Sequence, residues 1–301
     1  MVDRLRDLAR AKYELKKRIA RNDFLSFTKF TKEDYKENWH HKLLANKLQD
    51  FSDGKIKKLL VFMPPQHGKS ELTSRRLPAY LLGKNPNSKI IGCSYSSDLS
   101  TSFNRDVQRI IDSDSYSDLF PDTCLNDKKA KTDNKSNYLR NADIFQIVGF
   151  DGYYKSVGVG GSLTGTPADI GIIDDPVKDY IEASSVTYRE RAWDWFNSVF
   201  LTRLHNDSQI LITQTRWHQD DLSGRILERI NKDNSWEVIT LEAIKDKIHN
   251  EADPRNEGEA LWESRHSKNR ILEIKESSPK TFNALYQQSP KPDESSLIFN
   301  N

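Results

Sequence analysis

Short apolar runs alternate with amphipathic stretches along most of the chain. The apolar runs predict strands, and the clearest of them cover residues 56–63, 89–95, 142–150, 168–175 and 208–215. Apolar residues at helical spacing lie between these runs and predict helices over residues 69–82, 98–111, 186–204 and 219–231. This alternation predicts an α/β fold, with a mostly parallel sheet covered by helices on both faces.

The amino-terminal segment has a helical pattern of its own. Residues 1–22 place five apolar side chains at roughly helical spacing, namely Val2, Leu5, Leu8, Leu15 and Ile19. Residues 1–21 contain eight Lys or Arg against three Asp or Glu. Two interpretations stay open: an amphipathic helix packed on the core, or an arm that docks on a neighbouring subunit or on DNA.

Apolar density falls after about residue 242. Residues 245–262 are typical of a linker or loop, and residues 267–288 predict two short helices separated around Pro279. The polar end, residues 289–301, is expected to be extended. We therefore divide the chain into an amino-terminal helical arm (1–34), a core (35–241) and a small helical subdomain (242–301).

Composition narrows the class of protein only a little. With 301 residues, 36% of them hydrophobic, the chain suits one large domain or a core with a smaller subdomain. Its 46 basic and 44 acidic residues argue neither for nor against a nucleic-acid partner. Two cysteines, Cys93 and Cys124, cannot build a disulfide framework or a zinc cluster. No apolar run is long enough to span a bilayer, and the first residues are not a signal peptide.

The stretch LLVFMPPQHGKSEL, residues 59–72, is typical of a phosphate-binding loop because it follows an apolar run and opens a predicted helix. Gly68 permits close approach of the backbone to phosphate, Lys69 would reach the β- and γ-phosphates, and Ser70 would bind Mg²⁺. Met63 occupies the first glycine position of a Walker A loop, so a chance Gly-Lys-Ser remains the alternative. The predicted nucleotide contacts of the loop are Gln66, His67, Gly68, Lys69, Ser70 and Glu71.

The strand ADIGIIDDP ends in two carboxylates, Asp174 and Asp175. A P-loop enzyme needs a carboxylate at the end of a strand to hold Mg²⁺, and Asp174 fits that role. Many P-loop ATPases place a second carboxylate next to it to polarise the attacking water, where this chain has Asp175. The alternative is an Asp-Asp-Pro turn that binds no metal.

A third strand, ILITQTRWH, also ends in polar residues. Strands beside the P-loop strand often carry a side chain that senses the γ-phosphate, and the candidates here are Thr213, Gln214 and Thr215. Spacing does not choose among them, and an ordinary strand end capped by threonine is the alternative.

Six of the 13 glycines lie in residues 149–165, just before the acidic strand. Their backbone freedom suits a mobile or tightly turned loop. Such a loop would lie near the nucleotide or line a channel in which Lys155 meets DNA phosphate. The alternative is a long hairpin turn.

Taken together, these segments resemble the large terminase subunit of tailed bacteriophages, the DNA-packaging motor. The matching pieces occur in family order over about residues 35–290: YKENWHHKLLANKLQDF, MPPQHGKSEL, LGKNPNSKIIGCSYSSDLSTSFNRDVQRII, GGSLTGTPADIGIIDDP, TRWHQDDLSGRI and FNALYQQSP. The resemblance implies an ATPase core of the additional-strand (ASCE) P-loop class with a small helical lid subdomain, using ATP and Mg²⁺.

The resemblance also implies roles for individual residues. Lys69 and Ser70 match the Walker A lysine and serine, Asp174 matches the Mg²⁺-linked acid, and Asp175 stands at the catalytic carboxylate. The segment of residues 213–215 matches the motif that couples loss of the γ-phosphate to movement of a subdomain. Trp39 and His40 match the adenine side of the site.

Two departures from the family concern arginine. Relatives often have an arginine where this chain has Gln66, and another where it has Thr166. Positive charge for the transition state is therefore expected from elsewhere, including a neighbouring subunit, and can be worth orders of magnitude in rate. The candidates, in order of preference, are Arg203, Arg216 and Arg105.

The partners implied by the resemblance are double-stranded DNA bound without sequence preference, the portal protein, the small terminase subunit, and further copies in a ring on the procapsid in the host cytoplasm. A nuclease domain of the family would follow residue 301. Two alternatives remain open from the residues: a helicase-like translocase, and a nucleotide-gated assembly module that no longer hydrolyses ATP.

Overall fold

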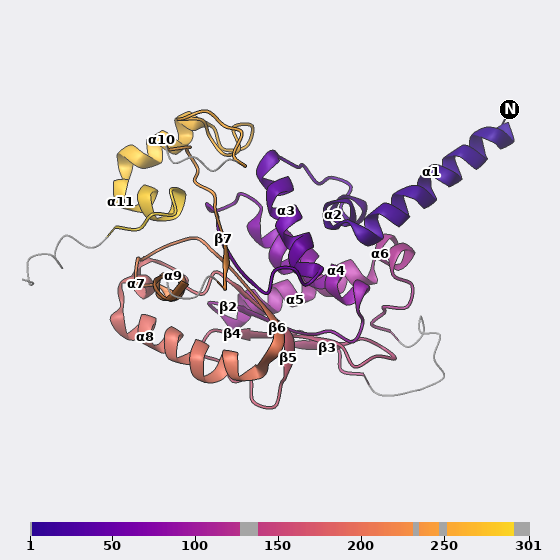
Figure 1. The fold of residues 1–301 in the computed structure, drawn as a ribbon, viewed down its shortest axis with the longest axis horizontal. Coiled ribbons are helices and arrows are strands. Elements are labelled where there is room, and N and C mark those ends of the chain that lie inside the picture. The colour runs from indigo at the N-terminus through magenta and orange to yellow at the C-terminus, as the bar shows by residue number, and fades with distance from the viewer. Residues whose placement is uncertain (1, 127–137, 231–234, 247–251, 292–301) are drawn as a thin grey trace, which may run out of the picture.

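A computed structural model describes residues 2–126, 138–230, 235–246 and 252–291 (Figure 1). The strands are β1 (Lys58–Phe62), β2 (Lys89–Ser94), β3 (Ile144–Gln146), β4 (Tyr153–Gly158), β5 (Ala168–Asp174), β6 (Leu204–Gln214) and β7 (Glu237–Thr240). They form one seven-stranded sheet in the order β3-β4-β2-β5-β6-β1-β7. Each described pair of neighbours is parallel except β3–β4. The predicted α/β fold with a mostly parallel sheet is confirmed.

The helices of the first half are α1 (Val2–Asn22), α2 (Phe24–Thr31), α3 (Trp39–Ser52), α4 (Leu77–Lys84), α5 (Ser97–Asp112) and α6 (Asp114–Leu119). Those of the second half are α7 (Tyr180–Ser184), α8 (Val186–Trp195), α9 (Leu222–Ile230), α10 (Lys268–Ser277) and α11 (Pro279–Thr281). The π-helical turns are η1 (Glu71–Arg76), η2 (Phe196–Phe200) and η4 (Phe282–Tyr286), and η3 (Leu201–Arg203) is a 3₁₀ turn.

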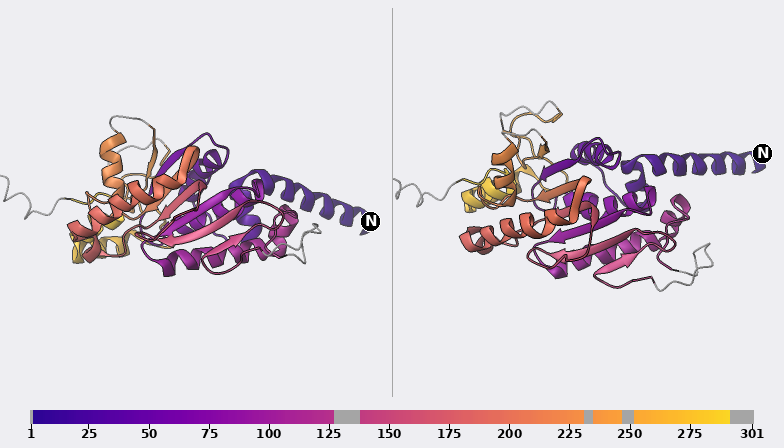
Figure 2. Two further views of the ribbon diagram at one scale, coloured as in Figure 1. Left: turned by 90° about the horizontal axis from the view of Figure 1, so that it is seen from below. Right: turned by 60° about the horizontal axis from the view of Figure 1, so that its bottom comes forward.

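Helices cover both faces of the sheet (Figures 1 and 2). On β1, Leu59 and Val61 pack with α2–α6, whereas Leu60 and Phe62 pack with α8, η2 and α9. Successive side chains of a strand point to opposite faces, so the continuous apolar runs of the sequence serve both layers at once.

The structure corrects several predicted elements. The first part of the glycine-rich segment is strand β4, which forms an antiparallel hairpin with β3, and β7 has no counterpart among the predicted strands. The helix predicted over residues 186–204 consists of α8, η2 and η3, and its last residue, Leu204, begins β6. The edge strand β7 has only four residues, so its apolar run is too short to stand out in the sequence.

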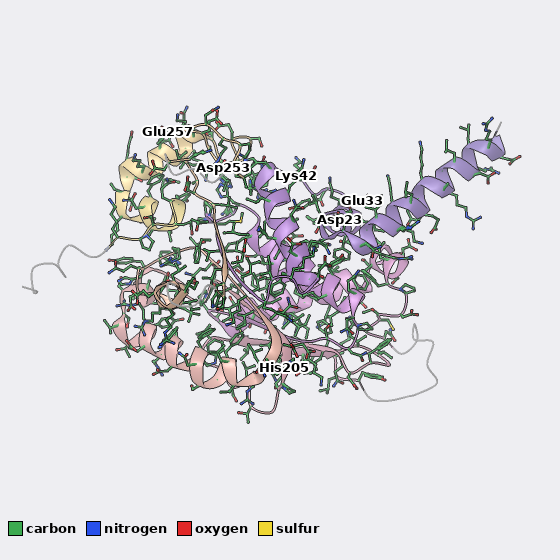
Figure 3. The ribbon with its side chains drawn as sticks, in the orientation of Figure 1. Asp23, Glu33, Lys42, His205, Asp253 and Glu257 are labelled. Carbon is green, nitrogen blue, oxygen red and sulfur yellow. The ribbon has the colours of Figure 1, made fainter. Side chains whose placement is uncertain are left out.

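The amino-terminal helix exists as predicted, but it is not packed along the core. In Figure 1, α1 projects from the body, and its side chains extend into solvent in Figure 3. Leu5, Leu8, Leu15 and Ile19 are 61%, 52%, 57% and 47% exposed. Only the end of the helix is anchored, through buried Ala20 and neighbouring groups, so the interpretation of a helix packed on the core is wrong.

Residues 241–289 form a small subdomain, called the lid here, at one end of the sheet (Figure 1). Its two predicted helical segments around Pro279 are present as α10 and α11–η4. Its apolar cluster is small, with Ala243, Ala260, Ile271 and Phe282 buried. The predicted extended end, residues 289–301, falls mostly outside the described residues. Within the described part of the chain, no helix combines the length and the apolar character that crossing a membrane requires.

Candidate nucleotide-binding site

Three adjacent strands bring the predicted site residues to one edge of the sheet. In the order β5-β6-β1, Asp174 is paired with Thr213, and Thr213 with Val61. Parallel strands end at the same edge, so the loop after β1 and the carboxylates after β5 meet there.

The loop after β1 has the backbone geometry of a phosphate cradle. Gln66 and Gly68 adopt positive φ values of 60° and 93°, which turn successive backbone N–H groups inward. A Cβ at Gly68 would lie 2.5 Å from Nε2 of His41, so only glycine fits. The Nε2 atoms of His40 and His41 lie 3.2 and 2.9 Å from the carbonyl oxygen of His67, which can accept a hydrogen bond from each ring. The two histidines thereby support the loop.

Lys69 lies at the centre of the site and is buried. Its ammonium pairs with Oδ2 of Asp175 at 2.7 Å and donates to Oγ1 of Thr215 at 3.2 Å. Burial alone would lower the pKa of Lys69, but the carboxylates of Asp175 and Asp174 outweigh it and raise this pKa. The lysine is therefore charged and already held where a phosphate would bind.

Asp174 is buried beneath Lys69. Ser74 donates to its Oδ2 at 2.5 Å, whereas Oδ1 is buried and has no hydrogen-bond partner among the described residues. Burial, and then the charge of Asp175, raises the pKa of Asp174 to about 6, although Lys69, Ser74 and Ser70 oppose the shift. A buried carboxylate oxygen without a hydrogen-bond partner, near the hydroxyl of Ser70, belongs to the kind of donor set that Mg²⁺ accepts, so the residues present fit the metal.

Asp175 is held in an unusual conformation. Its φ is +47°, in the left-handed region that Asp and Asn tolerate better than most residues. Its backbone N–H donates to the Thr213 carbonyl at 2.9 Å, and its Oδ1 accepts from the Thr215 N–H at 2.8 Å. The carboxylate is thereby turned toward Lys69 instead of continuing the strand.

The three polar residues at the end of β6 differ in their contacts. Thr215 is the member that contacts both Lys69 and Asp175. Thr213 is buried beside Asp174, and its hydroxyl has no partner among the described residues. Gln214 points elsewhere and donates to Asp221 at 3.0 Å. Of the three, Thr215 is therefore the residue that lies against the charged groups of the site.

A cleft of about 550 Å³ opens over the loop. Its walls combine the loop, the segment after α2, and the lid: Lys32, Asp34, Tyr35, Lys36, His41, Gln66, Gly68, Lys69, Ser70, Glu71, Arg75, Trp262 and Arg265. Trp39 and His40, predicted on the adenine side, are not among these residues. His40 is fully buried behind the loop, and Trp39 packs against Arg255, whose guanidinium lies 5.4 Å from its ring.

None of the three predicted arginines faces the cleft. Arg203 precedes β6 at the opposite edge of the sheet, near His205 in Figure 3, and β6 rises roughly 30 Å to the site. Arg216 is buried in an ion pair with Asp221 at 2.8 Å. Arg105 is exposed on α5.

Sequence reasoning missed two arginines that do line the cleft. Arg75 follows the loop, but it pairs with Asp106 at 2.7 Å. Arg265 comes from the lid and stacks on Trp262 at 5.1 Å. Two further residues were missed: Ser74, which donates to Asp174, and His266 of the lid, which contacts Gln66. Ser74 lies one helical turn after Ser70, and this spacing was a usable signal. The sequence around His266 gave no signal.

The lid contacts the phosphate loop through histidine. Nε2 of His266 lies 3.2 Å from the Gln66 carbonyl oxygen, and its ring stacks on His67 at 4.4 Å. Burial lowers the pKa of His67 to about 4 and of His40 to about 2, and it also lowers the pKa of His41 and His266. The rings around the loop are therefore neutral at pH 7.

A second contact joins the lid to the end of β6. The Arg216 N–H donates to Oε1 of Gln288 at 3.1 Å, and Gln288 has a positive φ of 54°. Lid residues thus touch both the loop that would hold phosphate and the strand end that would sense it.

Comparisons with known proteins give the following. A sequence model described as "Terminase large subunit, T4likevirus-type, N-terminal" matches residues 60–277. The large terminase ATPase domain of Thermus phage P74-26 is similar at 14% identity and a TM-score of 0.49, covering 77% of this chain and 87% of that chain. The large terminase of bacteriophage HK97 is similar at 15% identity and a TM-score of 0.49, covering 85% of this chain and 51% of that chain. No protein with a curated description matches the sequence.

Proposed function

The chain belongs to the T4-like family of large terminase subunits, and from this we propose that it is the ATPase part of a viral packaging motor. It hydrolyses ATP with Mg²⁺ to move double-stranded DNA into a procapsid. The observation that carries the proposal is the convergence of Lys69, Asp175 and Thr215 over buried Asp174.

The contacts of Lys69 suggest how the site changes when nucleotide binds. Its ammonium now neutralises Asp175. A triphosphate in the cradle offers the lysine a stronger anionic partner, so Lys69 exchanges Asp175 for phosphate oxygen. Asp175, still held through Oδ1 by the Thr215 N–H, then has Oδ2 available to accept a proton from the attacking water.

Asp174 and Ser70 would hold Mg²⁺, directly or through water. When bound, the metal would neutralise part of the charge of the phosphates. For this chain the consequence is that Asp174 must be deprotonated, although its pKa is raised to about 6. Ser74 donates to Oδ2 of Asp174, and Oδ1, which has no partner among the described residues, would be left for the metal.

Thr215 and Gln288 offer a route from hydrolysis to movement. Thr215 contacts Lys69, and the next residue, Arg216, is bonded through its backbone to Gln288 of the lid. When the γ-phosphate is lost, Lys69 returns to Asp175 and Thr215. This movement displaces Thr215, the residue that precedes Arg216 and its contact with the lid. The lid responds through Gln288 and, at the loop, through His266.

The first experiment measures ATP binding and phosphate release by the wild type and by Lys69→Ala. We expect Lys69→Ala to abolish hydrolysis, because the cationic contact to phosphate is lost. Lys55→Ala is the matched control, since Lys55 is an exposed lysine paired with Asp50 and Asp53 far from the cleft. Failure of the wild type to bind ATP would refute the proposal.

A second measurement concerns the missing arginine. None of the predicted arginines faces the cleft, and the two that line it are engaged elsewhere: Arg75 pairs with Asp106 and Arg265 stacks on Trp262. We therefore expect an arginine from a neighbouring copy, and the rate per subunit should rise with protein concentration. A rate that stays high and constant on dilution would rule out an arginine from a neighbouring copy. DNA binding should be independent of sequence and should weaken with salt, as phosphate contacts do.

A further inference from the structure

Exposed large apolar side chains gather in two places among the described residues. Five of them are on α1, and three, Tyr180, Ile181 and Val186, are on α7 and the start of α8. Ile181 is 81% exposed and Val186 is 61% exposed. We call Leu5, Leu8, Leu15 and Ile19 the arm patch, and Tyr180, Ile181 and Val186 the α7 patch. Clustered exposed apolar residues mark interaction surfaces more often than scattered ones do.

The arm patch is a narrow seam on one side of α1. Its residues are spaced by three, seven and four positions, so they lie on one face of the helix. The seam is about 21 Å long at 1.5 Å per residue. Lys12 and Lys16 lie along it and are exposed. A partner surface must therefore be apolar along its centre and acidic beside it.

The α7 patch offers exposed apolar side chains with carboxylates beside them, of which Glu190 is paired with Arg225 at 2.8 Å. Val186, Glu190 and Asp194 follow one another at intervals of four residues, so they form one exposed stripe along α8. A hollow of about 310 Å³ adjoins Tyr180, between α7 and the lid. The stripe thus continues an apolar patch into carboxylates, and the hollow gives large aliphatic side chains a place to insert.

Charge favours a second copy of the chain as the source of this surface. The helix α1 carries eight of the 46 basic and three of the 44 acidic residues, so its formal charge is +5 and that of the remaining chain is −3. Pairing α1 with another α1 would oppose these positive charges. Pairing α1 with the remainder of another copy would bring the positive helix against a surface of negative net charge.

The two patches cannot meet within one chain. Figures 1 and 2 place α1 at one end of the molecule and α7 at the other. The base of α1 is fixed, because Arg21 donates to the Leu119 carbonyl at 2.7 Å, Tyr13 donates to Asp118 at 2.5 Å, and Ala20 is buried.

We infer that the arm patch of α1 docks on the α7 patch of the next copy. The contact joins two different surfaces, so it repeats head to tail and closes as a ring or extends as a chain. One helix buries an area at the low end for specific complexes, so the assembly is weak at low concentration. The inference rests on the proposed function in one respect only: a packaging motor works as a ring.

Cysteine cross-linking tests the pairing directly. In a Cys124→Ser background, in which Cys93 is buried, we would mix Leu15→Cys protein with Ile181→Cys protein under mild oxidation. We expect a disulfide-linked dimer from the mixture and none from either variant alone. Leu139→Cys is the matched control, because Leu139 is exposed but lies outside both patches.

The other outcomes are decisive as well. A dimer from Leu15→Cys alone would mean that α1 pairs with itself, and equal cross-linking to Leu139→Cys would mean random collision; both overturn the inference. Sedimentation should show concentration-dependent association that Leu8→Glu/Leu15→Glu weakens about tenfold or more. A wild type that stays monomeric at every concentration, or an α1 variant that loses only DNA binding, overturns it too.

ATP binding separates this inference from the proposed function. The arm is remote from the cleft, so Leu8→Glu/Leu15→Glu should bind ATP as the wild type does. Cross-linking without ATP binding would refute the proposed function and leave the docking contact standing. ATP binding without cross-linking would do the reverse.

Discussion

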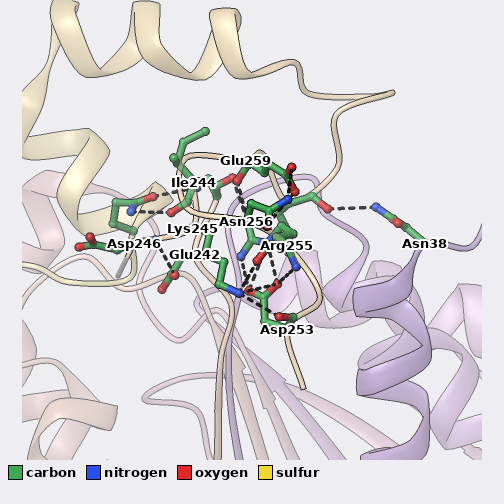
Figure 4. Close-up of polar contacts among 12 residues, drawn as sticks. Asn38, Glu242, Ile244, Lys245, Asp246, Asp253, Arg255, Asn256 and Glu259 are labelled. Carbon is green, nitrogen blue, oxygen red and sulfur yellow. Dashed lines mark hydrogen bonds and ion pairs between the residues drawn. The ribbon is translucent and has the colours of Figure 1, made fainter. Parts of the chain in front are cut away.

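The sheet and the lid are held together in different ways. The sheet is enclosed by two large apolar clusters, and each strand of its centre is covered on both faces. The apolar cluster of the lid itself has only four buried members among the described residues, and beside it lies a buried ionic cluster (Figure 4). In that cluster Arg255 pairs with Asp253 at 2.8 Å, and Lys245 donates to the Asp253 carbonyl at 2.9 Å.

The difference matters for a site built from both parts. Apolar burial is additive and tolerant, so the sheet fixes Asp174, Asp175 and Thr215 firmly. A buried ion pair adds little net stability, yet it is costly to break, because the remaining charge is left unpaired. The lid is thus a small body that keeps its own shape and can change its contacts with the loop as a unit.

The largest expected effect is on chemistry at the edge of the sheet. We expect Asp175→Asn to lower the rate of ATP hydrolysis by about 10²–10⁴-fold, because the proton acceptor is lost. Asparagine tolerates the positive φ of this position, so the backbone should be retained. Phosphate release gives the rate, and retained binding of ATP is the control. Unchanged hydrolysis would remove Asp175 from the mechanism.

The next effect is confined to the lid. We expect Asp253→Ala to destabilise it by about 3–5 kcal/mol, because Arg255 and Lys245 are left buried without their carboxylate. Hydrogen exchange should show lost protection in residues 252–286 while the sheet keeps its own.

The matched variant in the sheet is Ile172→Ala. Ile172 is buried between strands and helices, and its loss should cost about 2–5 kcal/mol of global stability. The Ile172→Ala variant should lose exchange protection throughout the domain rather than in one part of it. Similar exchange patterns for Asp253→Ala and Ile172→Ala would show that lid and sheet unfold as one unit.

Lowering the pH should change the stability of the lid and of the sheet differently. The pKa of His67 is about 4 and that of His40 about 2, both below the value of about 6.5 in an unfolded chain. The unfolded state therefore binds more protons below pH 6.5, and the contact between loop and lid weakens as the pH falls from about 6.5 toward 4.

Protonation of Asp174 has the opposite effect on the stability of the folded state. Its pKa of about 6 is above that of an unfolded aspartate, so its burial costs less as the pH falls from 6 toward 4. We expect exchange protection of the lid to fall with acid while that of β5 does not. His266→Gln should reduce the pH dependence of the lid; an unaltered profile would show that His266 does not titrate in this contact.

The smallest expected effect is at the lid face of the cleft. Arg265 stacks on Trp262 and lines the cleft. We expect Arg265→Ala to weaken ATP binding by about two- to tenfold, as for a partly exposed charge contact. Calorimetric titration gives the affinity, and Arg270→Ala, an exposed arginine on α10, is the control. Equal affinities for both variants would place the nucleotide away from the lid.

The sequence determined much of the fold and the centre of the site. Apolar runs reported the strands β1, β2, β5 and β6, because a strand buried on both faces must be apolar throughout. The residue types after β1 and β5 predicted Lys69, Ser70 and Asp174 as site residues, and the structure brings the three together at one end of the sheet.

Only the tertiary structure decided the rest. Of the three polar candidates it placed Thr215 against Lys69 and Asp175, and it left Trp39 and the predicted arginines out of the cleft wall. It also placed Ser74 on Asp174 and brought lid residues to the cleft. It also left α1 exposed, although the pattern of that helix fits packing and docking equally well. The reason is physical: periodicity records which side of an element is apolar, whereas a contact between Gln66 and His266, 200 residues apart, depends on how the whole chain packs.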